Sequence, residues 1–300
     1  MDKVIKITED IDLRLDKYLI DIIEDKTRTQ IQLMIENDEI LVNNEPTKAS
    51  YKLRKDDEIL IIFEEPVNLD IIPEDIPLDV FYEDKDLIVV NKPSGMVVHP
   101  AFGNYQGTLV NALMHHCKDL SGINGVIRAG IVHRLDKDTS GLIVACKNDF
   151  THKNLSKQFS DRTVTRKYIA IVHGIINHNL GKVEAPIGRS KEDRKLMGVV
   201  ENGRLAITNF RVLERFSNHT LVELSLETGR THQIRVHMKY IGYPVVGDPQ
   251  YGLKKDKSNH GQYLHAQTLG FIHPRTKEYM EFNSDLPDYF EAYLNELREE

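Results

Sequence analysis

Two aspartates lie among basic residues in a short segment between apolar stretches of the chain. Residues 131–144 read IVHRLDKDTSGLIV, which puts Asp136 and Asp138 in the predicted connection between two strands. The Ser-Gly pair favours a turn, but a turn alone does not need two carboxylates, an arginine and a lysine. Neighbouring cations keep a carboxylate ionised, as a nucleophile or a general base requires. The segment therefore predicts a catalytic carboxylate; a solvent-exposed polar hairpin is the alternative.

A second group of polar residues is predicted to begin a helix. Residues 226–239 read LETGRTHQIRVHMK, and Thr231 can cap the helix that follows. On this helix His232, Arg235 and Lys239 share one face, because they are spaced i, i+3 and i+7. The amides of a helix N-terminus and a row of cations suit a phosphate or a carboxylate partner. An ordinary solvated basic face is the alternative.

The histidines and cysteines do not predict a metal site. His232 and His237 are five residues apart, about 140° around a helix, and miss the same-face spacing of zinc ligands. His115 and His116 are adjacent, and no third ligand accompanies them. The two cysteines form no CxxC pair, which suits a reducing compartment. We expect no metal ion.

Charge is unevenly distributed along the chain. The 300 residues carry a net charge of -7, but residues 91–276 contain 26 Lys or Arg and only 14 Asp or Glu. Residues 1–66 contain 10 and 17 of these, respectively. A basic centre favours an anionic partner over chance clustering on a solvated surface. The apolar runs are too short to span a membrane and the N-terminus has no secretory signal, so we expect a cytoplasmic protein without a membrane partner.

The hydrophobic pattern predicts an α+β protein with two domains. A small helix–helix–strand domain is expected over residues 1–66, an acidic, proline-containing linker over 67–79, and a larger domain over 80–300. In the larger domain, short strands joined by turns predict a mainly antiparallel mixed sheet. The strands are predicted at Val80–Tyr82, Leu87–Val90, Ile131–His133, Leu142–Ala145, Lys167–His173, Asn209–Phe216 and Leu221–Leu226, and the helices at Leu109–Cys117, Phe150–Phe159 and Thr231–Ile241.

Several motifs, in order along the chain, resemble one enzyme family. Residues 133–142, HRLDKDTSGL, look like the catalytic motif of the pseudouridine synthases of the large-subunit ribosomal RNA type. Further matches are NKPSG at 91–95, RKY at 166–168 with VHG at 172–174, GRTHQIRVH at 229–237, the loop at 247–252, and LHA at 264–266. The resemblance extends from about residue 80 to residue 290, and several motifs together make it specific.

The N-terminal part resembles a different, RNA-binding family. Residues 12–60 are similar to the S4 module, beginning with RLDKYL at 14–19. The resemblance implies RNA contacts by Arg14, Lys17 and Arg28. The residue before Arg28 is Thr, where the S4 pattern usually has Ser. An S4 module ahead of this catalytic domain is similar to the D-type large-subunit ribosomal RNA synthases.

The catalytic resemblance implies isomerisation of a uridine in RNA to pseudouridine. The N1–C1′ bond breaks, the uracil turns within the site, and a C5–C1′ bond forms without a cofactor. Asp136 is the implied catalytic carboxylate, acting by attack on C1′, by attack on C6, or by removal of a ribose proton. Arg235 is implied to pair with Asp136. Tyr168 is implied to stack on the uracil, and Arg134 to hold the backbone or fill the space left by the flipped uridine.

Large-subunit (23S) ribosomal RNA, free or within an assembling subunit, is the partner that the two resemblances together favour. Transfer RNA is the alternative substrate. A non-catalytic RNA-binding factor of the same fold, acting in ribosome assembly, is the alternative from another class. A monomer is expected.

Overall fold

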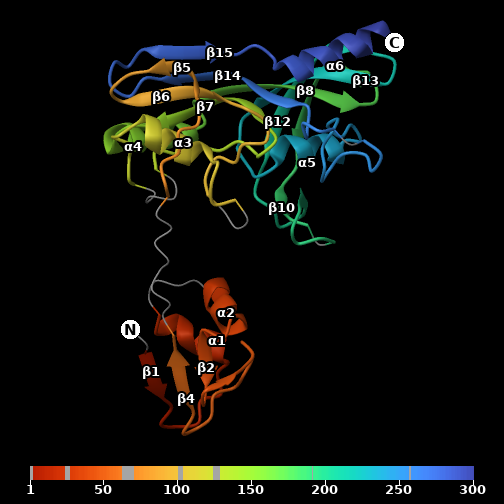
Figure 1. The fold of residues 1–300 in the computed structure, drawn as a ribbon. Helices are drawn as coiled ribbons and strands as arrows, with labels where there is room; N and C mark the ends of the chain where they lie inside the picture. The colour runs from red at the N-terminus through yellow and green to blue at the C-terminus, as the bar shows by residue number, and fades with distance from the viewer. Residues whose placement is uncertain are drawn as a thin grey trace. The chain divides into compact units, whose positions relative to one another are not determined.

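The chain divides into two compact units, Met1–Leu69 and Asp70–Glu300 (Figure 1). The computed structural model describes residues 3–23, 28–62, 71–100, 104–123, 129–190, 192–256 and 258–300. Each unit has a hydrophobic core of its own. Within the described ranges, no helix is long and apolar enough to cross a membrane.

The first unit packs short helices on a small antiparallel sheet. Its elements are β1 (Lys3–Lys6), α1 (Leu15–Tyr18), a 3-10 turn (Leu19–Asp21), α2 (Arg28–Glu36), β2 (Ile40–Val42), β3 (Glu45–Pro46) and β4 (Glu58–Ile61), with strand order β1-β4-β2-β3. Leu15 and Leu19 share a core with Ile31 and Ile35 of α2. The predicted helix–helix–strand arrangement is confirmed. The additional strand β1 has mostly exposed residues, so its hydrophobic pattern carries little signal.

The predicted linker, residues 67–79, packs in its second half on the larger unit. Ile71 is buried in the main core of that unit. Asn111 of helix α3 (Leu109–His116) donates from Nδ2 to the carbonyl of Ile72 at 2.9 Å. The first four residues of the predicted linker lie outside those that the structure describes.

The larger unit is built around one nine-stranded sheet. Its strands are β5 (Asp79–Glu83), β6 (Leu87–Lys92), β7 (Ser140–Cys146), β8 (Thr165–His173), β9 (Leu180–Glu184), β12 (Ile207–Arg215), β13 (His219–Leu226), β14 (Leu264–Ile272) and β15 (Tyr279–Asn283). The sheet order is β5-β6-β7-β14-β8-β13-β12-β9, with β15 paired to β14. Among the described strands, β14 and β7 pair in parallel and the other neighbours are antiparallel. The predicted α+β class with a mainly antiparallel mixed sheet is confirmed.

Helices cover both faces of this sheet. The remaining elements are α4 (Asp149–Ser160), β10 (Ile187–Arg189), β11 (Met197–Val199), α5 (Gln233–Tyr240) and α6 (Asp288–Glu299). Alternate residues of a strand point to opposite faces. In β8, Tyr168 and Ala170 therefore share a core with α3 and α5, whereas Ile169 and Ile171 share one with α6. Figure 1 shows α5 and α6 on opposite sides of the sheet.

The aspartate-bearing segment precedes a sheet strand as a loop. The predicted strand Ile131–His133 is wrong, because Ile131 forms only an isolated bridge to Ala145. Just inside β7, Gly141 has φ +115° and lies against the backbone of β14; a Cβ there would be 2.3 Å from the carbonyl oxygen of Ala266. Only glycine fits this position. The close approach anchors the end of the loop to the centre of the sheet.

Candidate active site

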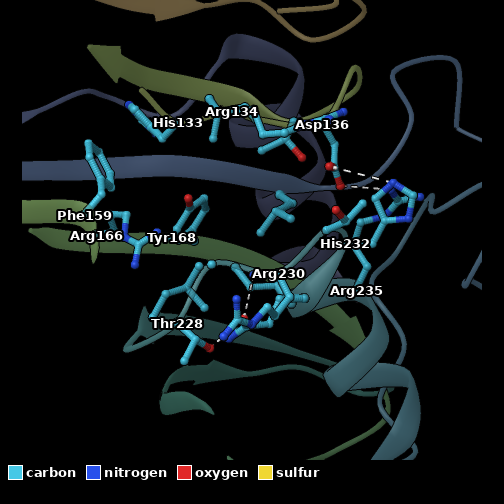
Figure 2. A pocket seen from close by; sticks show the side chains of 18 of the residues that line it. His133, Arg134, Asp136, Phe159, Arg166, Tyr168, Thr228, Arg230, His232 and Arg235 are labelled. Carbon is cyan, nitrogen blue, oxygen red and sulfur yellow. Dashed lines mark hydrogen bonds and ion pairs between the residues drawn. The ribbon is translucent and has the colours of Figure 1, made fainter. Parts of the chain in front are cut away.

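A pocket of about 450 Å³ lies between the loop before β7, strand β8 and helix α5 (Figure 2). Its lining includes Asp136 and Arg134 from the loop, Tyr168 from β8 and Arg235 from α5. The structure thus brings together the four residues that the sequence analysis predicts for the catalytic domain, although they are up to 101 positions apart in the chain.

Arg235 links two carboxylates at one end of the pocket. Its Nη1 donates to Asp136 Oδ2 at 2.9 Å. Its Nε and Nη2 donate to Asp248 at 2.6 and 2.9 Å, and Nη2 also reaches Gln250 at 3.1 Å. Arg235 and Asp248 are buried, whereas Asp136 is partly exposed to the pocket. The planar guanidinium therefore fixes the position of the Asp136 carboxylate by a charge-assisted bond.

The charge on Arg235 is secured by its two partners. Burial alone lowers the pKa of an arginine, but the hydrogen bonds and charges of Asp248 and Asp136 outweigh it and raise the pKa of Arg235. Asp248 balances most of this buried charge. The sequence analysis assigned no role to Asp248, although a buried arginine requires a carboxylate, and the loop at 247–252 supplies it.

His232 faces the free oxygen of Asp136. Its Nε2 lies 3.9 Å from Asp136 Oδ1, too far for a hydrogen bond. Its Nδ1 lies 2.8 Å from the hydroxyl of Tyr251, and this hydroxyl already accepts from the amide of Met197 at 2.9 Å. The Tyr251 hydroxyl hydrogen is thus directed to Nδ1, and burial lowers the pKa of His232. The neutral ring therefore presents Nε2–H to the space in front of Asp136.

Helix α5 begins later than predicted. Its first helical residue is Gln233, and the preceding His232 is in the left-handed region with φ 57° and makes no capping hydrogen bond, so the prediction of Thr231 as the cap is wrong. Instead, the Gln233 side chain accepts from the Arg230 amide at 2.9 Å. The turn at His232 places its ring in the pocket, which helical spacing does not predict.

Tyr168 and Arg134 occupy different surroundings in the pocket. Tyr168 is 7% exposed, and burial raises the pKa of its phenol, which is therefore neutral. Its flat ring lines the pocket between Arg166 and Asp136 (Figure 2). Arg134 is exposed at the pocket and forms no ion pair with any described residue. A buried ring and a free cation suit a base and its backbone, respectively.

Lys92 supports the loop that carries Asp136. The side chain is 1% exposed, and Nζ donates to the carbonyls of Pro93, Met96 and Lys137 at 2.7, 2.8 and 3.0 Å. Burial lowers the pKa of Lys92 to about 7. The three carbonyls match the three hydrogens of its ammonium group. Lys92 thus ties the loop after β6 to the residue that follows Asp136.

In the S4-like unit, two of the three predicted RNA-binding residues are engaged within the protein. Arg14 and Arg28 donate to the fully buried carboxylate of Asp16 at 3.0 and 2.9 Å, and Gln32 adds a bond of 2.7 Å. Although burial opposes ionisation, these bonds lower the pKa of Asp16 to about 2. Lys17 is exposed. The arginines thus have a structural role, which the sequence pattern does not reveal.

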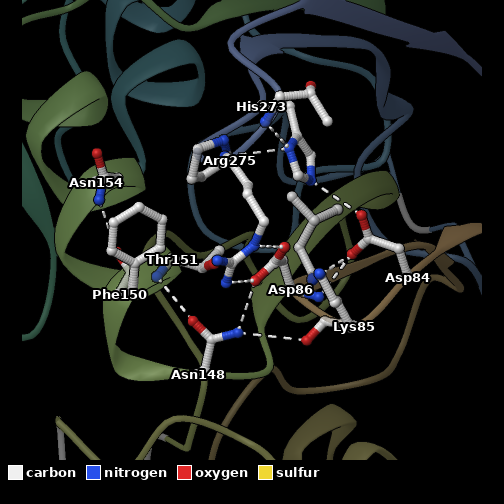
Figure 3. Close-up of polar contacts among 12 residues, drawn as sticks. Asp84, Lys85, Asp86, Asn148, Phe150, Thr151, Asn154, His273 and Arg275 are labelled. Atoms are coloured by element: carbon white, nitrogen blue, oxygen red, sulfur yellow. Dashed lines mark hydrogen bonds and ion pairs between the residues drawn. The ribbon is translucent and has the colours of Figure 1, made fainter.

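Two groups of described residues have metal-ligating side chains close together, and protein cations already neutralise both. Asp84, Asp86 and His273 form the first group (Figure 3). Arg275 binds both oxygens of Asp86, and His273 bonds to Asp84 at 2.9 Å. In the second group, Glu83, His116 and Cys117, Glu83 pairs with Lys147 at 2.9 Å. Both groups are explained as ion-pair networks.

Comparison with known proteins gives the same assignment for both units. Residues 86–240 match the family model of RNA pseudouridylate synthase, and residues 13–59 match the S4 domain. An RNA pseudouridine synthase of Bacillus subtilis is 55% identical over 95% of this chain and 94% of its own. The ribosomal large subunit pseudouridine synthase D of Zymomonas mobilis is 51% identical over 72% of this chain and 71% of its own.

Solved structures agree with this assignment. The human RNA pseudouridylate synthase domain containing 1 covers 78% of this chain and 98% of its own, with a TM-score of 0.59 and 25% identity. The matched segment, 86–240, holds the loop of Asp136, strand β8 with Tyr168, and Arg235. The pocket and the sequence motifs are thus explained together, and this chain belongs to the RNA pseudouridylate synthase family.

Proposed function

We propose that the chain converts uridine in large-subunit ribosomal RNA to pseudouridine, with Asp136 as its catalytic carboxylate. The observation that carries this proposal is the position of the Asp136 side chain. One oxygen is held by buried Arg235 at 2.9 Å, while the other faces the pocket. A carboxylate fixed in this way is ready to attack or to accept a proton without reorganisation.

Three residues around Asp136 have the other roles in the proposed reaction. Arg235 keeps the carboxylate ionised and oriented. The buried ring of Tyr168 stacks on the uracil while the N1–C1′ bond breaks and the C5–C1′ bond forms. Arg134, exposed at the mouth, holds the RNA backbone or occupies the space left by the flipped uridine. The reaction is an isomerisation without net oxidation, reduction or group transfer, so it needs no cofactor.

Relatives and charge favour ribosomal RNA as the substrate. Proteins of Zymomonas mobilis and Neisseria meningitidis, 51% and 43% identical to this chain, are named ribosomal large subunit pseudouridine synthase D. The S4 domain precedes the catalytic unit, and residues 91–276 have an excess of 12 basic side chains. This substrate places the protein in the cytoplasm, where it acts as a monomer.

The test maps pseudouridine in cells that lack the chain and in cells that express wild type, Asp136→Asn or Asp138→Asn. Asp138 lies in the same loop but does not line the pocket, so it is the matched control. Carbodiimide-dependent reverse-transcription stops are read over large-subunit ribosomal RNA and transfer RNA. We expect stops in ribosomal RNA that wild type and Asp138→Asn restore and Asp136→Asn does not. Stops confined to transfer RNA contradict the substrate, and stops independent of Asp136 contradict the catalytic role.

A further inference from the structure

Arg166 lies at the end of the pocket opposite Asp136. Figure 2 shows Phe159 and Arg166 at one side, Asp136 with Arg235 at the other, and Tyr168 between them. The charges of both Arg166 and Asp136 act on the Tyr168 phenol, which agrees with this order. The ring of Tyr168 thus separates the Arg166 guanidinium from the Asp136 carboxylate.

Among the described lining residues, no carboxylate pairs with Arg166. Asp136 is the one acidic residue in this described lining, and it is bound by Arg235. The other lining arginines, Arg134, Arg162, Arg166 and Arg230, form no ion pair with any described residue. Unpaired cations gathered in a concave site attract an anion.

Arg166 is the one of these cations that has a buried donor without an acceptor among the described residues. Its Nε is buried and has no hydrogen-bond acceptor among the described residues. Its guanidinium lies 5.6 Å from the centre of the Phe159 ring. The nearby His133 gives no compensation, because its Nε2 already accepts from the amide of Val144 at 3.1 Å. The contact with Phe159 favours this position of the guanidinium, but a buried donor without an acceptor costs stability, so the described contacts leave its hydrogen-bonding capacity unused.

The backbone makes room for the Arg166 guanidinium. Gly229 lies so close that a Cβ there would be 2.8 Å from Arg166 Nη1. A side chain at this position would therefore displace the Arg166 guanidinium from where it now lies. The Arg166 guanidinium thus lies between the Phe159 ring and the backbone of Gly229, and Arg166 lines the pocket.

We propose that Arg166 binds a backbone phosphate of the RNA, immediately next to the uridine that lies against Tyr168 and Asp136. This inference rests on the proposed function and adds a phosphate subsite to it. A guanidinium can bind two phosphate oxygens at once, and a phosphodiester supplies one negative charge for each nucleotide. The uracil at Tyr168 and the phosphate at Arg166 then fix the nucleotide at both ends.

The first test measures the salt dependence of binding and turnover on a transcript of the large-subunit RNA segment that carries the mapped uridine. Full-length Arg166→Gln is compared with wild type, Arg166→Lys and Arg211→Gln. Arg211 is an exposed arginine on β12, paired with Glu223 and outside the pocket, and serves as the control. For Arg166→Gln we expect a KM about 10-fold higher, kcat within about 3-fold, and a salt slope smaller by about one. Arg166→Lys keeps the wild-type slope.

The outcomes separate this inference from the proposed function. An unchanged salt slope, or a loss confined to kcat at unchanged KM, overturns the phosphate subsite, provided that the melting temperature is unchanged. If the wild type makes no pseudouridine, the proposed function fails instead. The salt slope of binding, which needs no turnover, still tests Arg166 in that case.

The second test identifies the phosphate. Single methylphosphonate substitutions, which remove one charge each, are placed on either side of the target uridine in a synthetic RNA. We expect one of them to weaken wild-type binding about 10-fold and to leave the binding of Arg166→Gln unchanged, because the two changes remove the same contact. Additive losses at both positions overturn the assignment.

Discussion

At the residue scale, the site depends on the orientation of one carboxylate. Arg235 donates to Asp136 with one nitrogen and to Asp248 with two others. The two carboxylates bind the same guanidinium. Asp248 stabilises its positive charge, and Asp136 is held on the side of the guanidinium that faces the pocket. An arginine can serve both because its donors are planar and fixed, which a lysine cannot reproduce.

The tautomer of His232 gives a prediction for Tyr251→Phe. This change removes the hydroxyl that donates to Nδ1 but keeps the ring over Arg235, whose guanidinium carbon is 4.9 Å from the ring centre. Because the neutral form loses its hydrogen bond, we expect the pKa of His232 to rise. The acid limb of the pH profile of kcat/KM then moves to higher pH, so kcat/KM falls severalfold at about pH 6 and changes less above neutral pH.

The control for this prediction is Tyr240→Phe. Tyr240 is exposed at the end of α5 and has no part in the pocket. The pH profile of kcat/KM of Tyr240→Phe is expected to match that of the wild type. An acid limb that does not move in Tyr251→Phe contradicts the role of the hydroxyl in setting the state of His232.

At the scale of elements, Lys92 holds two loops together, and Lys92→Met tests this. The variant leaves the carbonyls of Pro93, Met96 and Lys137 without their donor. Since a buried carbonyl left without a donor costs about 1–3 kcal/mol, we expect a clearly lower melting temperature. The loop of Asp136 also shifts, so kcat falls at least 10-fold.

Lys137→Met, which changes an exposed side chain of the same loop, is the control. Wild-type kcat in Lys92→Met contradicts the positioning role.

Much of this arrangement of elements is predictable from the sequence. Strands such as β6 and β8 are runs of buried apolar residues, and their type and position match the prediction closely. The motifs also locate the loop of Asp136 and the helix of Arg235. Strand β14 is not predicted, because its Leu264–Ile272 segment contains His, Gln, Thr and Gly, whose burial depends on neighbouring strands. Helix α6 is also not predicted, although its buried Phe290, Leu294 and Leu297 have helical spacing.

Features of the site that depend on long-range contacts are not predictable in this way. The pairing of Arg235 with Asp248, the left-handed turn at His232 and the unpaired Arg166 all depend on where separate elements meet. The structural role of Arg14 and Arg28 also depends on a contact that the sequence does not reveal. Their positions fit RNA binding in the sequence, but the buried Asp16 that they share is visible only in the fold.

At the scale of the whole molecule, the two units have separate cores, and the smaller unit has an acid-sensitive group of ion pairs around Asp16. The pKa of Asp16 is about 2, below its unfolded value of about 4. The stabilisation by its ion pairs is therefore present above about pH 4 and is lost as the pH falls towards 2. In full-length Asp16→Asn, we expect residues 3–62 to exchange amide hydrogens faster at pH 6, and this difference from wild type to shrink in acid. Asp12→Asn, at an exposed ion pair, is the control. A difference that grows on acidification contradicts this linkage.

The distribution of charge between the units gives a prediction on RNA discrimination. Residues 1–69 contain 10 basic and 17 acidic side chains, whereas residues 91–276 of the catalytic unit contain 26 and 14. Since like charges repel, an acidic S4-like unit opposes binding of RNA that makes no specific contacts. Glu9, Glu36 and Glu45 are exposed and form no ion pair with any described residue.

Their combined replacement by Gln is expected to raise affinity for an unrelated transcript severalfold at low salt, and to have little effect at high salt, where screening is strong. Because these residues belong to the S4-like unit, kcat on the target transcript stays at the wild-type value. Neutralising basic Lys3, Lys48 and Lys55, which are also exposed, is the matched control and is expected to lower nonspecific affinity. If both triple variants bind the unrelated transcript as wild type does, the charge of the S4-like unit has no part in selecting RNA, and discrimination resides in the catalytic pocket alone.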